Sequence, residues 1–228
     1  MSLYRWSIGI PFVNRPDLLR RAIASVPEPY REHVFVMDSS PDGLGAEELF
    51  VSVLRPTVPL SLTQTMNWLA KRSQENNEDF FCYMHSDAEA EPGTVEALLE
   101  RVGELIASRA RWGVVFTNYD TLAAYNSAAV KEVNGWDTVI QTYFCDNDFH
   151  RRVVLAGYEL IETKLPVRHN EGGSRTIHSD PMKRRLHDIT YPLFESYYEK
   201  KWGGRPGEEV FLKPFNWATG SELEEWGG

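Results

Sequence analysis

The sequence is poor in cysteine and has no long apolar run. Its 228 residues include only Cys82 and Cys145, too few for a disulfide framework, so we expect a reducing, cytoplasmic setting. No stretch approaches the roughly 18 apolar residues of a membrane span, and the first residues lack the ordered segments of a secretory signal. These absences predict a globular protein without a transmembrane segment and leave contact with a membrane surface open.

Positive charge is also in deficit. The chain has 24 Lys and Arg residues against 33 Asp and Glu residues, a net charge of −9. Nucleic-acid binding depends on basic side chains that neutralise phosphates, so we expect no nucleic-acid partner. Hydrophobic residues make up 42% and charged residues 25% of the sequence, which excludes disorder along the whole chain. The length is that of one large domain with or without a small appendage.

Several glycine-containing signatures are missing as well. The sequence contains neither a G-x-x-x-x-G-K-[ST] loop nor a strand-linked G-x-G-x-x-G pattern, so it is not a P-loop or dinucleotide-binding protein of the usual kind. The G-x-S-x-G turn of the α/β-hydrolases is absent too.

What is present is an alternation of strand-like and helix-like patterns. Apolar runs that predict strands lie at residues 5–10, 33–37, 49–54, 80–84 and 114–117. Helical periodicity begins at Pro16, Leu62 and Pro92. This alternation predicts an α/β fold, a mostly parallel sheet with helices on both faces.

The pattern changes after residue 120. We expect helices over 127–133 and 146–156, strands over 159–163 and 166–168, and a helix over 182–201 that is interrupted at Pro192. The stretch 169–174 reads as a glycine-rich polar loop.

Three polar loops follow predicted strands, at residues 14–16, 38–40 and 85–87. Ligands of parallel sheets bind beyond the carboxyl ends of the strands, so these loops are the expected binding region. His85 and Asp87 could hold a Mn²⁺ or Mg²⁺ ion together with a diphosphate. The alternative is that Asp87 is an ordinary turn residue at a helix start.

Two further clusters carry chemistry-bearing side chains. Asp146 and Asp148 stand at the start of a predicted helix, where either could act as a general base. The alternative gives Asp146 a helix-capping role and pairs the acids with neighbouring arginines. His169 and His178 flank the glycine-rich loop and could contribute imidazole to a metal or phosphate site, or lie at the surface.

Taken in order, these segments resemble the glycosyltransferases of family two, which have the GT-A fold. The similar stretches are residues 7–23, 34–40, 85–87, 132–158 and 168–174. The resemblance covers roughly residues 5–178. It implies a glycosyltransferase domain over 1–178, with a nucleotide-binding part up to about residue 120 and an acceptor part after it, followed by a helical or irregular extension over 179–228.

The resemblance also assigns roles to single residues. Asp87 matches the last acid of the family's Asp-x-Asp metal motif, and His85 stands where the first acid is expected. His169 matches the closing histidine of the metal or diphosphate site, with His178 as the alternative. Asp38 matches the aspartate that contacts the nucleotide base. The other expected donor-binding residues are Pro11, Asn14, Arg15 and Ser86.

On the acceptor side, Asp146 matches the catalytic base, and Asp148 is the fallback. Cys145 stands where the family has a glutamate. Trp136 could stack on a sugar ring or belong to the core.

The implied reaction is an inverting, metal-dependent sugar transfer from a nucleotide diphosphate sugar to a hydroxyl. UDP is the expected nucleotide, and the acceptor could be a glycan, a lipid-linked glycan, a small molecule or a protein. Two alternatives remain. An inactive sugar-nucleotide-binding protein would explain His85 and Cys145, whereas a nucleotidyltransferase would need a Gly-rich, Lys-containing loop that the first strand lacks.

Overall fold

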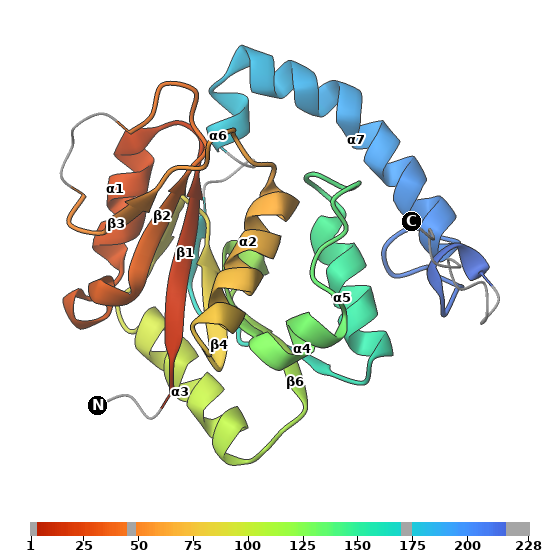
Figure 1. Ribbon diagram of the computed structural model, residues 1–228, viewed down its shortest axis with the longest axis horizontal. Coiled ribbons are helices and arrows are strands. Elements are labelled where there is room, and N and C mark those ends of the chain that lie inside the picture. The colour runs from red at the N-terminus through yellow and green to blue at the C-terminus, as the bar shows by residue number, and fades with distance from the viewer. Residues whose placement is uncertain (1–3, 45–48, 170–174, 218–228) are drawn as a thin grey trace, which may run out of the picture.

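A seven-stranded sheet forms the centre of the protein (Figure 1). The computed structural model describes residues 4–44, 49–169 and 175–217. The strands of the sheet, in spatial order, are β3 (Ser52–Leu54), β2 (Val34–Asp38), β1 (Trp6–Phe12), β4 (Phe80–Met84), β7 (Leu122–Asn126), β6 (Trp112–Phe116) and β8 (Glu159–Glu162). In this sheet β7 runs antiparallel to both its neighbours, and the other neighbouring pairs are parallel. The predicted α/β fold with a mostly parallel sheet is therefore confirmed.

A second, two-stranded sheet joins distant parts of the chain. β5 (Ala88–Ala90) pairs antiparallel with β9 (Val167–His169), and the register sets Ala88 opposite His169. The sequence predicts β9 but not β5, which has only three residues. This pairing carries His169 to the loop that contains Asp87.

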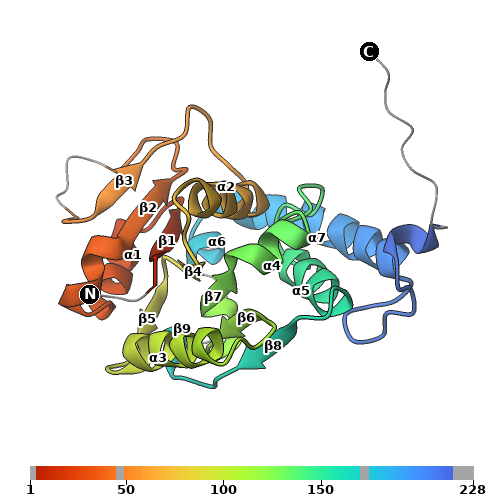
Figure 2. The same cartoon turned by 60° about the horizontal axis from the view of Figure 1, so that its bottom comes forward.

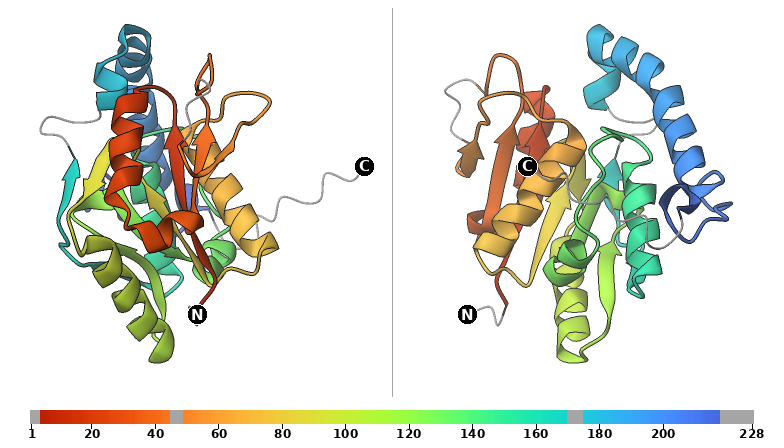
Figure 3. Two further views of the ribbon diagram at one scale, coloured as in Figure 1. Left: turned by 90° about the vertical axis from the view of Figure 1, so that its left-hand side faces the viewer. Right: turned by 45° about the vertical axis from the view of Figure 1, so that its right-hand side comes forward.

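Helices cover both faces of the large sheet (Figures 2 and 3). One core lies beneath α1 (Pro16–Ser25) and α3 (Thr94–Ala107), with a short 3-10 helix, η1 (Glu28–His33), beside β1. The other core lies beneath α2 (Leu62–Glu75), α4 (Ser127–Glu132) and α5 (Cys145–Leu155). Within β4, Phe80 and Cys82 enter the first core while Phe81 and Tyr83 enter the second, because successive side chains of a strand point to opposite faces.

Local signals set the helix starts. Ser61 and Gln64 form a reciprocal capping box that begins α2. Pro16 occupies the first turn of α1, as expected for a residue that needs no donor there. The third helix begins at Thr94, two residues after the predicted start at Pro92, because Gly93 adopts a left-handed φ of 85° at the N-cap.

Two expectations about proline need correction. β1 does not end at Pro11 but continues to Phe12, with Pro11 in register with Met37. Pairing of β1 with β4 stops at Gly9, so the missing N–H of Pro11 breaks no ladder on that side. The helix α7 (Pro181–Trp202) likewise runs through Pro192, which is exposed, and follows a curved path (Figure 1).

The C-terminal segment joins the second core. Phe194, Tyr198 and Trp202 of α7 are buried against the residues around α5. The chain then turns back through η3 (Pro214–Asn216), with the backbone N–H groups of Val210 and Phe211 donating to the Trp202 carbonyl. The division at residue 178 remains a prediction, since α7 shares its core with the part before it. None of the described helices has both the length and the apolar character to cross a membrane.

Candidate active site

The post-strand loops meet at one edge of the sheet. β2, β1 and β4 are adjacent and parallel, so their carboxyl ends lie side by side. The backbone N–H of Ser39 donates to the carbonyl of Phe12 at 2.8 Å, which ties the second loop to the first. The three polar loops therefore meet at one edge of the sheet, where ligands of parallel sheets bind.

Three potential metal ligands converge at this edge. Ligand atoms of His85, Asp87 and His169 all lie within 4.8 Å of one another. His169 Nε2 is 3.2 Å and His85 Nδ1 is 3.9 Å from Asp87 Oδ1. The buried strand β4 positions the first two residues and the β5–β9 pair positions the third. His178, the alternative to His169, is exposed on the short helix α6 (Arg175–His178) and is not part of this group.

The protonation states of the group suit a cation. Burial alone would raise the pKa of Asp87, but the His169 hydrogen bond and the favourable electrostatic interactions with both histidines outweigh it and lower the pKa to about 2. Burial and the neighbouring His169 lower the pKa of His85 to about 4, so its imidazole is neutral near pH 7. An ionised carboxylate and a neutral imidazole are the forms that bind metals. This mixed nitrogen and oxygen donor set fits Mn²⁺ better than Mg²⁺, which prefers oxygen.

The short helix α6 lies over the group. The backbone N–H of Arg175 donates to Asp87 Oδ2 at 3.0 Å, and Asn14 Nδ2 donates to the carbonyl of Thr176 at 2.8 Å. α6 thus connects the loop after β1 to the loop after β4. The glycine-rich stretch 170–174 lies outside the described residues.

The other predicted donor-binding residues occupy the same edge. Arg15 has a left-handed φ of 62° and forms an ion pair with Asp17. The hydrogen bond to Asp17, and then the charges of Asp17 and Asp87, raise the pKa of its guanidinium. Pro11 pairs with Met37 of β2 one residue before the end of β1, and Ser86 is buried in the loop between His85 and Asp87.

The carboxylate of Asp38 is hydrogen-bonded within the loop that follows β2. Its buried carboxylate accepts hydrogen bonds from the backbone N–H groups of Ser40 and Leu44 and lies 3.5 Å from Arg55. Burial opposes ionisation, but these hydrogen bonds outweigh it and lower the pKa of Asp38. Asp38 therefore shapes the turn after β2.

The two acids of α5 lie in different environments. Phe144 is the N-cap of α5, so Asp146 is inside the first turn and is not the capping residue. Asp146 is partly exposed, and within the described ranges no side chain hydrogen-bonds or pairs with its carboxylate. Asp148 is fully buried.

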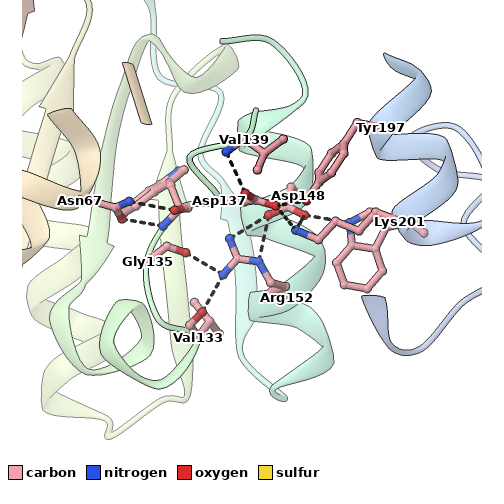
Figure 4. Close-up of polar contacts among 11 residues, drawn as sticks. Asn67, Val133, Gly135, Asp137, Val139, Asp148, Arg152, Tyr197 and Lys201 are labelled. Carbon is pink, nitrogen blue, oxygen red and sulfur yellow. Dashed lines mark hydrogen bonds and ion pairs between the residues drawn. The ribbon is translucent and has the colours of Figure 1, made fainter. Parts of the chain in front are cut away.

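The carboxylate of Asp148 is saturated by partners (Figure 4). Arg152 Nε and Trp202 Nε1 each donate to it at 2.9 Å, and Lys201 Nζ lies 2.6 Å away. Lys201 also binds Asp137 at 2.6 Å, while Arg152 donates to the carbonyls of Val133 and Gly135. This network holds α5, the turn before it and α7 together.

Trp136 belongs to the core. Its side chain is 5% exposed and stacks on Phe149 with ring centroids 3.9 Å apart. The Asn67 side chain donates to the backbone carbonyl of Trp136 and accepts a hydrogen bond from its backbone N–H, as Figure 4 shows. The packing favours the core alternative for this residue over a sugar-stacking role.

Tyr83 interacts electrostatically with both the candidate metal-binding group and the first turn of α5. Burial raises the pKa of its phenol well above the usual value, and the charges of Asp87 and Asp146 raise it further. Both acids are therefore within electrostatic reach of one buried side chain, whose ring is 5.1 Å from that of His85. The predicted ligand Asp87 and the predicted base Asp146 therefore both lie in the neighbourhood of Tyr83.

Asp120 and His150 lie near Asp146. The sequence patterns do not point to either residue. Asp120 Oδ2 lies 3.6 Å from His150 Nε2. Burial raises the pKa of Asp120 to about 6; His150 lowers it and the charge of Asp146 raises it. Asp120 follows the carboxyl end of β6, which is parallel to β4, so the rule that selected the other loops would have found it.

An α/β sheet of this strand order, with a histidine–carboxylate group at its carboxyl edge and a free acid beyond it, has the architecture of a GT-A glycosyltransferase. The family model described as Glycosyl transferase family 2 matches residues 7–149, more than half of the chain. The chain therefore belongs to glycosyl transferase family 2 and is a glycosyltransferase. No curated protein matches the sequence closely enough to count as a relative.

Solved structures support the fold. The chain is similar to the mannosyltransferase PcManGT from Pyrobaculum calidifontis, solved with GDP-Man and Mn²⁺, at a TM-score of 0.61 and 14% identity over 87% of this chain and 70% of that one. It is also similar to S. aureus TarS residues 1–349 with UDP-GlcNAc, at a TM-score of 0.53 and 11% identity over 75% of this chain. This chain spans 60% of that TarS chain. At such identities the likeness establishes the GT-A fold.

Proposed function

We propose that this glycosyltransferase moves a sugar from a nucleotide diphosphate sugar to an acceptor hydroxyl with inversion, assisted by a divalent cation. The observation that carries the proposal is that His85, Asp87 and His169 converge and that the charges of both Asp87 and Asp146 act on the same buried side chain, Tyr83. The His85, Asp87 and His169 group suits a diphosphate with its cation, and Asp146 offers a proton acceptor. A donor sugar bound between them would meet both.

The donor half would hold the nucleotide along the loops after β1, β2 and β4. His85, Asp87 and His169 would hold Mn²⁺, which when bound offsets the negative charge of the leaving diphosphate. Arg15 adds positive charge beside Asp87. UDP is the proposed nucleotide; because the similar solved structures contain GDP-Man and UDP-GlcNAc, GDP stays a direct alternative.

On the acceptor side, Asp146 would accept the hydroxyl proton while the acceptor oxygen forms its bond to the anomeric carbon. The bond from that carbon to the diphosphate oxygen breaks in the same displacement, so the configuration inverts. Asp148 is a poor base because Arg152, Lys201 and Trp202 occupy its oxygens. Asp146 has the accessible carboxylate.

Cys145 stands where the family has a glutamate but does not take over proton transfer. Burial, and next the charge of Asp146, raise the pKa of the thiol well above its usual value, so it stays neutral. It packs in the core beneath α5 and leaves proton transfer to Asp146. Both cysteines are free and buried, consistent with the proposed cytoplasmic setting.

A donor panel tests the proposal. The full chain is incubated with UDP-, GDP- and dTDP-sugars and Mn²⁺, and release of the nucleoside diphosphate is measured with and without EDTA. We expect turnover of one donor class that EDTA stops and Mn²⁺ restores. Tight nucleotide binding without any turnover would favour the inactive sugar-nucleotide-binding alternative, and turnover insensitive to EDTA would remove the metal from the proposal.

A further inference from the structure

The long helix α7 carries an apolar stripe on its outer side. Four large side chains are mostly exposed there, with exposed fractions of 73% for Met182, 58% for Leu186, 55% for Ile189 and 62% for Leu193. Their spacing of four, three and four residues places them along one line of the helix. At about 100° per residue they fall within an arc of about 60°.

This stripe does not take part in the fold. The residues by which α7 packs on the protein are Phe194, Tyr198 and Trp202, all buried in the second core. The same helical arithmetic puts the middle of that buried face about 150° away from the stripe. Figures 1 and 2 show α7 along the outer edge of the molecule.

Two cations, and none of the acids of α7, lie on or beside the stripe. Arg185 borders it and Lys200 continues its line, both exposed. The acids of the same stretch, Asp188, Glu195 and Glu199, lie more than about 100° from its centre. In a chain with a net charge of −9, an apolar line bordered by cations and cleared of acids is a local exception.

We propose that this face of α7 binds an anionic lipid surface, with the four apolar side chains in the interfacial region and Arg185 and Lys200 against the headgroups. An amphipathic helix with cations beside its apolar face has the composition of an interfacial helix. The stripe is one residue wide and about three turns long, which suits insertion between headgroups.

A second copy of this chain fits the stripe less well. Parallel pairing of two α7 helices would set Arg185 beside its own copy. Antiparallel pairing centred on the stripe would place Lys200 beyond Pro181, where the partner's α7 begins, so that it would meet no acid of that helix. Like charges that face each other across a helix pair oppose association. The charge pattern therefore selects an anionic surface over self-pairing.

Docking through α7 would bring the candidate site to the lipid surface. α7 follows α6 directly, and α6 contacts both Asp87 and Asn14 through its backbone. The edge of the sheet with the metal-binding group thus lies next to the first turns of α7 (Figure 1). The membrane inference does not depend on the proposed reaction, and its test uses binding alone.

The test is sedimentation of the full chain with vesicles of phosphatidylcholine alone or with about 30% phosphatidylglycerol. We expect binding to the anionic vesicles only, weakened when salt is raised from about 0.1 to 0.5 M. The double variant Leu186→Gln/Ile189→Gln should bind about tenfold or more weakly. The matched control, Val58→Gln/Val154→Gln, changes two exposed apolar residues outside α7 and should bind like the wild type.

A fluorescent label tests which face of α7 meets the lipid. Cys82 and Cys145 are buried, so a cysteine introduced by Ile189→Cys or Asp188→Cys can be labelled selectively with a polarity-sensitive dye. We expect a blue shift on anionic vesicles at position 189 and none at position 188. Equal shifts at both positions, or vesicle binding untouched by the stripe variants, would overturn the inference. So would the absence of vesicle binding together with a dimer that the stripe variants abolish, because a second copy would then be the partner.

Discussion

Asp146 and Asp148 stand two residues apart in the first turn of α5, yet among the residues that the structure describes only Asp148 has partners for its carboxylate. Asp148 is fully buried and bound by Arg152, Lys201 and Trp202. The Asp146 side chain is partly exposed, and its charge acts on Tyr83 and Asp120. The helix thus assigns a structural role to one acid and leaves the other available for chemistry.

The first prediction concerns Asp146. Asp146→Asn keeps the shape of the side chain but removes the proton acceptor, so transfer should fall by about 100-fold or more. Binding of UDP with Mn²⁺, measured by calorimetry, and the thermal midpoint should stay close to the wild type. Transfer at the wild-type rate in this variant would remove Asp146 from the base role.

The second prediction concerns the network around Asp148. Lys201→Met leaves the buried Asp148 and the partly buried Asp137 with one cation fewer, so the free energy of unfolding should drop by about 3 kcal/mol or more. Urea unfolding followed by tryptophan fluorescence measures the loss. Lys200→Met, at the exposed neighbouring position, is the control and should change stability by less than about 0.5 kcal/mol. Equal effects of both changes would contradict the role given to the network.

The third prediction is a pH dependence that comes from Asp120. Its pKa is raised from 3.8 to about 6 in the folded protein, so ionisation of this carboxyl costs stability as the pH rises from about 4 to 7. Asp120→Asn removes that cost. The variant should therefore gain stability over the wild type with rising pH, by up to about 2 to 3 kcal/mol at pH 7, and gain nothing at pH 4. Thermal midpoints across this range would refute the assignment if the difference stayed constant.

The fourth prediction concerns the choice of metal. His85→Asp restores a carboxylate where the family has its first acid and removes a nitrogen ligand. Because Mg²⁺ prefers oxygen ligands, the preference for Mn²⁺ over Mg²⁺ should fall in this variant. The rise in thermal midpoint on adding each metal with UDP gives the preference. An unchanged ratio would mean that His85 does not contact the cation.

Much of the fold could be predicted because its central strands are buried on both faces. Phe80–Met84 is a continuous apolar run and was identified as a strand, as was Val34–Asp38 to within a residue. β7 was missed because Leu122–Asn126 is a short segment with two alanines. Its strand character comes from pairing between β4 and β6, which a local pattern does not contain.

The site was predictable where its residues follow one strand. His85 and Asp87 share a loop, and the resemblance supplied His169 from more than 80 residues away. The role of Asp148 was open, because its partners Lys201 and Trp202 lie on a helix that the sequence divides at Pro192. Long-range contacts of this kind decide which of two neighbouring acids is free.

The account rests on a cation bound by Asp87 at the edge of the sheet beside the nucleotide. Titration of the full chain with Mn²⁺, followed by the electron paramagnetic resonance signal of the free ion, tests this directly. We expect one Mn²⁺ per chain, bound more tightly when UDP is present and lost in Asp87→Asn. Mn²⁺ binding that is the same in the wild type and in Asp87→Asn would contradict the account.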